Sequence, residues 1–189
     1  VYAAGVNPVD WKIREGYLKE MAPLQFPATL GGDFSGVVKG TGEEVYGQAG
    51  LVNGGSGSFA ELALADLTKI AHKPKRVNHE EAAVLPLAAV SAYQGVVEHI
   101  NLQNGQKILI HGGAGGIGGF AVQIAKHLGA YVATTVSAQD IDYVKGLGAD
   151  MVIDYKTQRF EDLIHEYDAV FDDSGSGGDT YERSFRVVK

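Results

Sequence analysis

Cysteine is absent from the sequence, and this absence excludes several kinds of chemistry at once. Without thiols the chain can form no disulfide bond, no thiolate nucleophile and no zinc site built on sulfur ligands. Basic residues are also few, with 16 Lys and Arg against 23 Asp and Glu. They form no cluster dense enough to neutralise a row of phosphates, so we expect no nucleic acid partner.

A long apolar run is missing as well. No stretch approaches the roughly 18 apolar residues that a membrane span needs, and no signal-peptide pattern is present. We therefore expect no membrane partner and a cytoplasmic location. The first residues, VYAAGVNP, start inside an apolar strand, and the last, SFRVVK, stop where another strand should begin. We expect a fragment of a longer protein or a partly ordered chain.

Apolar residues are nevertheless plentiful, at 45% of the 189 positions, which is enough for one large or two small domains. Residues 1–70 are rich in glycine and in short β-like runs, namely VYAAGV, FSGVVKG, EEVYGQ and SFAELALA. Short strands separated by glycines are typical of an antiparallel barrel or sandwich. The first part of the chain therefore predicts an antiparallel β domain.

Helix signals interrupt this pattern at two places. In NPVDWKIREG, Asn7 can cap a helix, Pro8 suits its first position, and the Asp10 carboxylate favours the free amides and the dipole there. The segment 78–100 is rich in alanine, with apolar residues at helical spacing. Pro86 should break that segment into two helices.

The rhythm of the sequence changes at Gly105 to an alternation of strands and helices. The predicted strands are β-branched and lack the alternating pattern of half-buried strands, as in KILIHG, YVATTVS, MVIDY and YDAVFDDSG. This alternation is typical of a buried parallel sheet with crossover helices. The second part of the chain therefore predicts a doubly wound α/β domain.

A glycine turn lies between the first of these strands and the helix that follows. Gly113, Gly115 and Gly118 fit the G-x-G-x-x-G spacing of dinucleotide-binding turns. The first glycine allows the tight turn, the second lets backbone amides approach a pyrophosphate, and the third lets the helix pack on the strand. The cofactor-binding turn is thus predicted to consist of Gly113, Ala114, Gly115, Gly116, Ile117 and Gly118.

The end of the second strand indicates which dinucleotide binds. NAD sites usually carry an acid there, and such a carboxylate would repel a 2′-phosphate. Here the strand ends in TTVSAQD, and the hydroxyl of Ser137 favours NADP. Asp140 lies within reach of the same region and could itself be the acid of an NAD site. Tyr155, after the third strand, could stack on the adenine or reach the phosphate, or it could simply pack.

Taken together, these segments resemble the zinc-independent quinone oxidoreductases, the zeta-crystallin-like branch of the medium-chain dehydrogenase/reductase superfamily. The resemblance rests on AAGVNPVDWKIREG, FPATLGGDFSGVV, GSFAELALA, AAVLPLAAVSAYQGV, ILIHGGAGGIGGFAVQIAKHLGA and LGADMVIDY, in this order. It implies an α/β fold in which a GroES-like antiparallel β-barrel domain, residues 1–90 without its first strands, joins a Rossmann NADP-binding domain, residues 91–189 without its end. It also implies an active site in the cleft between them.

The same resemblance bears on zinc. Alcohol dehydrogenases of this superfamily hold a catalytic zinc with Cys, His and Glu, and the corresponding positions here are Asn7, Gly32 beside Asp33, and Leu87. Neither Asn nor Leu is a serviceable zinc ligand, and the four-cysteine structural lobe is missing. We therefore expect no metal. Quinones and α,β-unsaturated ketones suit such a site, because their conjugation spreads the negative charge that arrives with hydride.

The resemblance places three residues near the nicotinamide. Asn7 and Asp10 occupy slots where the family uses Asn and Asp, and Ser91 occupies the slot of a Thr or Ser. From the residues alone, Asn7 and Asp10 could equally be a plain helix N-terminus, and Ser91 could bond back to its own helix. His111 is expected to be a satisfied core or cleft-wall residue. Asp172 is expected at the carboxyl end of the fourth strand.

The sequence thus predicts an NADPH-dependent, zinc-independent enzyme that transfers hydride to a small quinone or related enone. Two alternatives stay open: an alkenal or enoyl reductase on the same fold, and a non-catalytic NADPH-binding redox sensor or interaction protein. The family resemblance also implies a homodimer.

Overall fold

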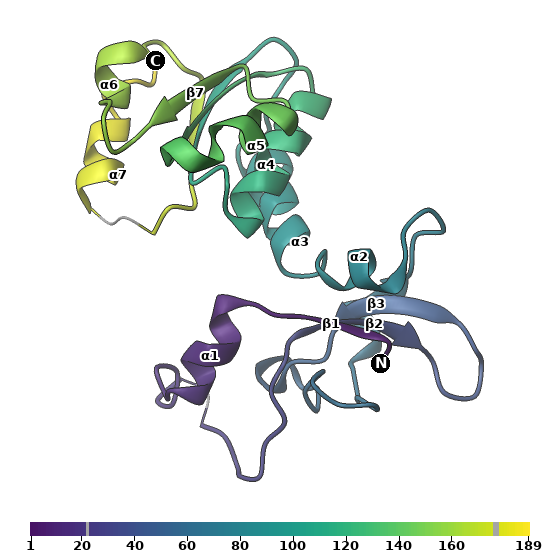
Figure 1. Ribbon diagram of the computed structural model, residues 1–189. Coiled ribbons are helices and arrows are strands. Elements are labelled where there is room, and N and C mark those ends of the chain that lie inside the picture. The colour runs from purple at the N-terminus through teal and green to yellow at the C-terminus, as the bar shows by residue number, and fades with distance from the viewer. Residues whose placement is uncertain (22, 176–177) are drawn as a thin grey trace. The chain divides into compact units, whose positions relative to one another are not determined.

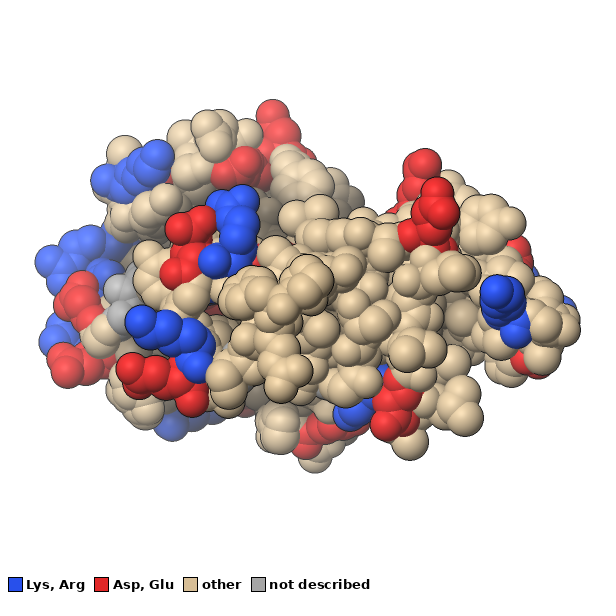
Figure 2. Space-filling model, turned by 90° about the horizontal axis from the view of Figure 1, so that it is seen from below, with Lys and Arg blue, Asp and Glu red and all other residues tan. Residues whose placement is uncertain are grey.

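Two units of different architecture make up the chain (Figure 1), and they divide after Leu87, close to the boundary predicted after residue 90. The computed structural model describes residues 1–21, 23–175 and 178–189. Within these residues, no helix has the length and apolar character needed to cross a bilayer. On the face seen in Figure 2, Lys and Arg stand beside Asp and Glu and do not form a continuous basic surface.

The first unit, Val1–Leu87, is built on a four-stranded antiparallel sheet. Its strands follow one another in space as in sequence: β1 (Ala3–Gly5), β2 (Asp33–Val37), β3 (Glu44–Gln48) and β4 (Ile70–His72). Phe34, Val45 and Ala49 form the buried cluster of this unit. The predicted antiparallel β unit is therefore confirmed.

One predicted strand of this unit is wrong. The segment SFAELALA, residues 58–65, forms bends and irregular backbone. The N–H groups of Ser58 and Phe59 donate to the carbonyls of Gly31 and Leu30, so this segment pairs briefly with a loop. Ala63 and Ala65 pack against the buried cluster while Leu62 and Leu64 are exposed, so the segment has an inner face without forming a strand.

Short helices complete the first unit: α1 (Pro8–Arg14), the helical turns η1 (Leu51–Asn53) and η2 (Leu67–Lys69), and α2 (His79–Ala83). α1 begins as predicted, because Asn7 is extended, Pro8 takes the first position, and the Asp10 carboxylate accepts the Asn7 N–H at 2.7 Å. The break predicted at Pro86 is also confirmed, since α2 ends before it and α3 (Ala88–Tyr93) starts after it.

The second unit, Ala88–Lys189, is built on a parallel sheet in the order β7-β6-β5-β8. Its strands are β5 (Lys107–His111), β6 (Tyr131–Val136), β7 (Met151–Asp154) and β8 (Ala169–Asp172). The helices are α3, its π-helical extension η3 (Gln94–His99), α4 (Gly116–His127), the turn η4 (Ala138–Asp140), α5 (Ile141–Gly146), α6 (Phe160–Leu163) and α7 (Gly178–Ser184). The predicted doubly wound sheet, and with it the α/β class, is confirmed.

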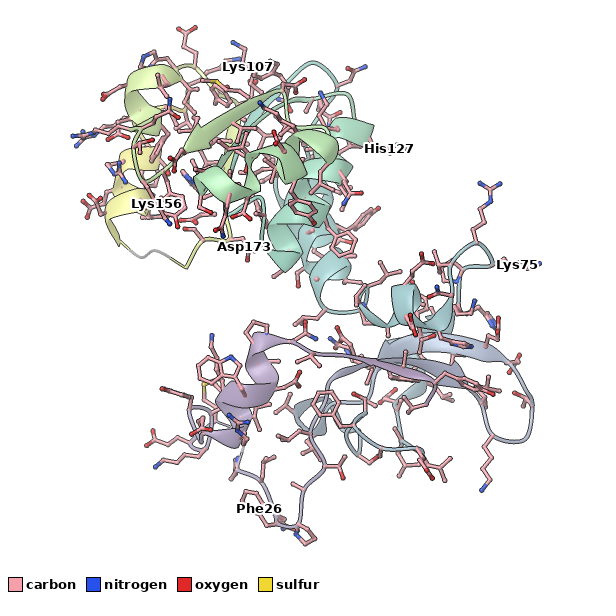
Figure 3. All side chains as sticks on the ribbon, viewed as in Figure 1. Phe26, Lys75, Lys107, His127, Lys156 and Asp173 are labelled. Carbon is pink, nitrogen blue, oxygen red and sulfur yellow. The ribbon has the colours of Figure 1, made fainter. Side chains whose placement is uncertain are left out.

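Both faces of this parallel sheet are buried. Along β5, Ile108 and Ile110 belong to one core cluster, while Leu109 between them belongs to another. Full burial of each such side chain contributes about 1.5–3 kcal/mol. Figure 3 shows Lys107, where β5 begins, and Asp173, just past the end of β8, at opposite ends of this unit. The carboxyl ends of the strands therefore share one edge, where ligands of such sheets bind.

Candidate functional site

A cavity of about 410 Å³ lies at the carboxyl edge of the parallel sheet, and we call it the strand-end cavity. Residues at or just after the ends of four strands line it. They come from the glycine turn after β5, the end of β6, the residue after β7 and the two residues after β8. The lining residues used below are His111, Gly112, Ala114, Gly115, Thr135, Ser137, Asp140, Tyr155, Phe160, Asp173 and Arg183.

Three positions of the glycine turn require glycine, each for a different physical reason. Gly112 has a φ of 77°, so the left-handed position of the turn lies one residue before the predicted Gly113. A Cβ on Gly113 would lie 2.0 Å from Oγ1 of Thr134, so this glycine permits contact with β6. A Cβ on Gly118 would lie 2.1 Å from the Gly112 carbonyl oxygen, so this glycine lets α4 approach the turn. The spacing is that of a dinucleotide-binding turn.

α4 begins at this turn, with Gly115 as its N-cap, and Gly116, Ile117 and Gly118 form its first turn. Gly118 donates its N–H to Oδ2 of Asp173 at 3.2 Å. Burial raises the pKa of Asp173, the Gly118 N–H partly offsets this, and the neighbouring Asp172 raises it further. A carboxylate therefore already uses one of the amides that attract anions at a helix N-terminus. Asp173 was not among the predicted site residues, although a second acid directly after a strand was a usable signal.

Two of the predicted cofactor contacts lie at the cavity wall, Ser137 directly after β6 and Tyr155 directly after β7. Ser137 donates its hydroxyl to Oδ2 of Asp140 at 2.5 Å, and both line the strand-end cavity. Tyr155 lines the same cavity and is 59% exposed, so its ring is not a core residue. The structure thus groups Ser137, Tyr155 and part of the glycine turn, and it adds Asp140 to them.

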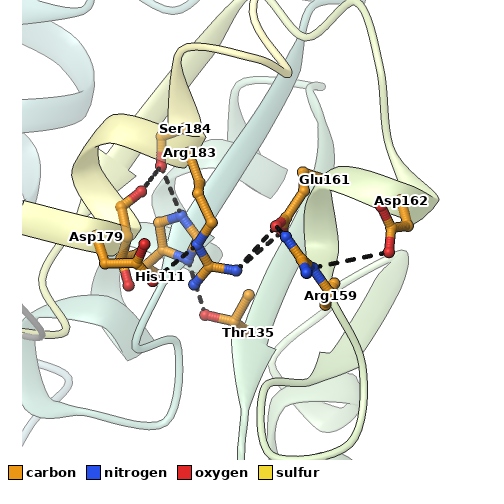
Figure 4. A network of polar contacts seen from close by, with 9 residues as sticks. His111, Thr135, Arg159, Glu161, Asp162, Asp179, Arg183 and Ser184 are labelled. Atoms are coloured by element: carbon orange, nitrogen blue, oxygen red, sulfur yellow. Dashed lines mark hydrogen bonds and ion pairs between the residues drawn. The ribbon is translucent and has the colours of Figure 1, made fainter.

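A polar network lies against the cavity (Figure 4). His111 is buried and contacts Oγ1 of Thr135 at 3.0 Å and Oγ of Ser184 at 3.1 Å, which confirms it as a satisfied core residue. Burial lowers the pKa of His111, the charge of Asp172 opposes this shift, and the charge of Arg183 reinforces it.

Glu161 and Arg183 form the charged part of the network. Oε2 of Glu161 and Nη1 of Arg183 are 3.0 Å apart, and Arg159 contacts the same carboxylate at 2.8 Å. Burial acts to raise the pKa of Glu161, but its own backbone N–H and the two arginines outweigh this effect and lower the pKa to about 2. The guanidinium of Arg183 also lies over the Phe160 ring, 5.0 Å from its centre. This ion pair joins α6 to α7 beside the strand-end cavity.

The first unit holds a separate cavity of about 340 Å³, which we call the Asn7 cavity. Its wall combines apolar side chains with a small polar group made of Asn7, Asp10, Asp33 and Gln48. The apolar lining residues are Val9, Ile13, Leu30, Leu51, Val52 and Leu87. Asn7 and Asp10 are thus brought to one cavity. Ser91 belongs to the other unit, where it lies half-buried on α3.

Asp33 is the centre of the polar group. Its Oδ2 accepts hydrogen bonds from Nδ2 of Asn7 at 2.9 Å and from the Leu87 N–H at 3.0 Å. Its Oδ1 accepts one from Nε2 of Gln48 at 3.3 Å. Burial raises the pKa of Asp33, these three donors partly offset the effect, and the charge of Asp10 adds to it. Sequence reasoning missed this role, although a carboxylate within the short, apolar run of β2 was a signal.

The Asn7 cavity does not fit a catalytic zinc. The amide nitrogen of Asn7 and the backbone N–H of Leu87 both donate to Asp33, and neither residue carries the thiolate or imidazole of a zinc ligand. No group of three or more His, Asp or Glu able to hold a metal occurs among the described residues. The polar side chains of this cavity, two carboxylates and two amides, include no imidazole or thiolate, the ligands on which zinc sites are mostly built.

The chain is similar to known oxidoreductases along its whole length. The family described as "Alcohol dehydrogenase GroES-like domain" matches residues 1–75, and the family described as "Zinc-binding dehydrogenase" matches residues 116–189. The 2-methylene-furan-3-one reductase of Solanum lycopersicum is 40% identical over 100% of this chain and 51% of its own length. The chloroplastic NADPH-dependent alkenal/one oxidoreductase of Arabidopsis thaliana is 39% identical over the same shares.

The fold is also similar to that of a solved oxidoreductase structure. The quinone oxidoreductase from Coxiella burnetii superimposes with a TM-score of 0.82 at 32% identity, over 100% of this chain and 62% of that one. The chain spans about half the length of the curated relatives that it matches. The family matches, the relatives and the fold agree: the chain belongs to the medium-chain dehydrogenase/reductase superfamily of oxidoreductases, in the branch of the quinone oxidoreductases.

Proposed function

We propose that the protein is an NADPH-dependent oxidoreductase that transfers hydride to small quinones or α,β-unsaturated carbonyls without a metal. The observation that carries the proposal is the glycine turn with its helix N-terminus, at the wall of the strand-end cavity. The names of the Arabidopsis and Coxiella proteins support NADPH as the donor and a quinone or enone as the acceptor.

In this proposal the strand-end cavity holds the dinucleotide. The turn from Gly113 to Gly118 lies against the pyrophosphate and presents backbone N–H groups to it, as helix N-termini do with anions. The Gly118 N–H, which donates to Asp173, is not one of them. The Ser137 hydroxyl turns from Asp140, to which it donates in this structure, and donates to the 2′-phosphate instead. Tyr155 stacks on the adenine. The bound nicotinamide supplies the hydride, and the protein supplies orientation and the exclusion of water.

Asn7, Asp10 and Ser91 are the proposed catalytic residues. One N–H of Asn7 is held by Asp33, which fixes the plane of the amide. The second N–H then donates to the acceptor oxygen as negative charge develops on it. Asp10 keeps Asn7 in place by accepting its backbone N–H. The Ser91 hydroxyl contacts the nicotinamide or the acceptor.

We assign substrate binding to the first unit and NADP binding to the second. A homodimer and a cytoplasmic location stay predictions, and the Arabidopsis relative is named as a chloroplastic protein.

The proposal is tested by oxidation of NADPH and NADH by the complete protein, with a simple quinone and a simple enone as acceptors. Turnover with NADPH in the presence of a metal chelator supports the metal-free reductase, and the faster acceptor names its class. Faster turnover of the enone favours the second candidate function, an alkenal reductase, to which the names of the tomato and Arabidopsis relatives also point. Binding of NADPH without turnover of any acceptor contradicts the proposal and favours a redox sensor.

A further inference from the structure

Asp33 only holds Asn7 in the proposed reaction, and that role gives no purpose to the negative charge of its buried carboxylate. It is 1% exposed, yet its carboxylate belongs to the wall of the Asn7 cavity. All three of its hydrogen-bond partners are N–H donors: the amides of Asn7 and Gln48 and the backbone of Leu87. A set of partners that only donate favours the ionised carboxylate, which only accepts hydrogen bonds. A protonated carboxyl group would point its own O–H hydrogen at an N–H donor.

No cation compensates this charge in the part of the chain that the structure describes. The lining of the Asn7 cavity includes no Lys, Arg or His, and Asp33 makes no ion pair there. Asp10, the second acid of the cavity, is also buried, and it adds negative charge. The other lining side chains are mostly apolar, so little solvent screens the two carboxylates.

We propose that Asp33 is a specificity-determining residue that makes the Asn7 cavity reject anionic acceptors and admit neutral ones. This inference rests on the proposed function, because it takes the Asn7 cavity as the acceptor site. It narrows the substrate class to uncharged quinones and enones and excludes their carboxylates and sulfonates. A like charge a few ångströms from Asp33 would lower kcat/KM for an anion by roughly 100-fold at the effective dielectric of such sites.

The test compares acceptors of matched skeleton and different charge. Acetylacrylate is compared with its methyl ester, and naphthoquinone sulfonate with naphthoquinone, with NADPH as the donor and the complete protein. The wild type is expected to reduce the neutral member of each pair with the higher kcat/KM. Equal kcat/KM for the neutral and anionic members overturns the inference and leaves the proposed function standing. Reduction of neither neutral acceptor overturns both.

Two substitutions cancel the negative charge of Asp33, one by removing it and the other by placing a cation beside it. Asp33→Asn keeps a carbonyl oxygen to accept from Asn7 and Leu87 but removes the charge. Gln48→Lys keeps a donor toward Asp33 and adds a cation, so it serves if the first variant does not fold. Each is expected to narrow the neutral-to-anion ratio of kcat/KM by about ten-fold, because Asp10 retains its charge.

Glu15→Gln is the matched control, since it removes an exposed carboxylate of the same unit that lies at the end of α1. The ratio is expected to stay at its wild-type value in this variant. A folded Asp33→Asn or Gln48→Lys variant that leaves the ratio unchanged overturns the inference. A change in Glu15→Gln as large as in Asp33→Asn also overturns it, because the effect would then come from net charge.

Discussion

Asn7 and Asp33, 26 positions apart in the sequence, are joined by a hydrogen bond of 2.9 Å from Nδ2 to Oδ2. The bond links the N-cap of α1 to the first residue of β2, and thus fixes the amide of Asn7 within the cavity wall. A helix cap with only a local role would not need a partner so far along the chain. This relationship is the structural basis for proposing that Asn7 acts on the substrate.

Replacing Asn7 by Ala is expected to lower kcat by roughly 100-fold, the usual effect of removing one donor to a developing oxyanion. The affinity for NADPH is expected to change little, because the proposed dinucleotide contacts lie in the other unit. Stopped-flow turnover and NADPH fluorescence titration measure the two effects separately. A rise in KM with unchanged kcat would contradict this role. It would mean that Asn7 binds the acceptor equally well in the ground state and in the transition state.

The choice between NADPH and NADH is expected to depend on Asp140, whose carboxylate accepts the Ser137 hydroxyl at the cavity wall. Replacing Asp140 by Ser removes a negative charge next to the proposed 2′-phosphate site. The kcat/KM for NADPH is expected to rise by about ten-fold, while the kcat/KM for NADH changes little. Asp142→Asn, an exposed position on α5, is the control. A fall in the NADH rate with no gain for NADPH would identify Asp140 as the acid of an NAD site.

Gly113 is expected to tolerate no side chain, because a Cβ there would lie 2.0 Å from Oγ1 of Thr134. Gly113→Ala should lower the free energy of unfolding by about 1–3 kcal/mol, as overpacking does, and should weaken NADPH binding. Gly146→Ala is the matched control, since a Cβ on Gly146 meets no atom within 4 Å and the residue ends α5. Urea unfolding and NADPH titration measure both variants. Equal free energies of unfolding and equal NADPH affinities for the two variants would contradict the close approach of Gly113 to Thr134.

The ion pair of Glu161 predicts a dependence of stability on pH. The pKa of Glu161 is lowered from 4.5 to about 2, so its stabilising effect is complete above pH 4.5 and is lost as the pH falls toward 2. Glu161→Gln should lower the free energy of unfolding by about 1–3 kcal/mol at neutral pH, less than for a fully buried pair because Arg159 is exposed.

The difference in Tm between wild type and Glu161→Gln should therefore shrink on acidification and be smallest near pH 2. Asp162→Asn is the control, since Asp162 is exposed and lies 3.8 Å from Arg159. It should change the free energy of unfolding by less than about 0.5 kcal/mol. A Tm difference for Glu161→Gln that does not vary with pH would mean that packing, and not charge, holds α6 to α7.

Local patterns predicted much of this fold. The start of α1 follows from Asn7, Pro8 and Asp10, and the break between α2 and α3 follows from Pro86, because caps and prolines act on neighbouring backbone. The strands of the parallel sheet could be located because burial on both faces requires continuous apolar runs. The strand predicted at residues 58–65 fails because its backbone pairs only briefly, with the loop at Leu30 and Gly31, although Ala63 and Ala65 pack on the buried cluster.

The candidate site was only partly predictable. The glycine spacing located the turn, but it did not reveal that Gly112 holds the left-handed conformation. Asp33 and Asp173 could not be assigned their partners, because those bonds join positions far apart in sequence. Ser137 and Tyr155 could be placed, since the carboxyl ends of parallel strands meet at one edge.

The decisive experiment follows the consumption of reduced nicotinamide by the complete protein with a neutral quinone and a neutral enone, in the presence of a metal chelator. We expect turnover to be faster with NADPH than with NADH and to be unaffected by the chelator. Bound NADPH that is oxidised by neither acceptor, or turnover abolished by the chelator and restored by zinc, would contradict the proposed function.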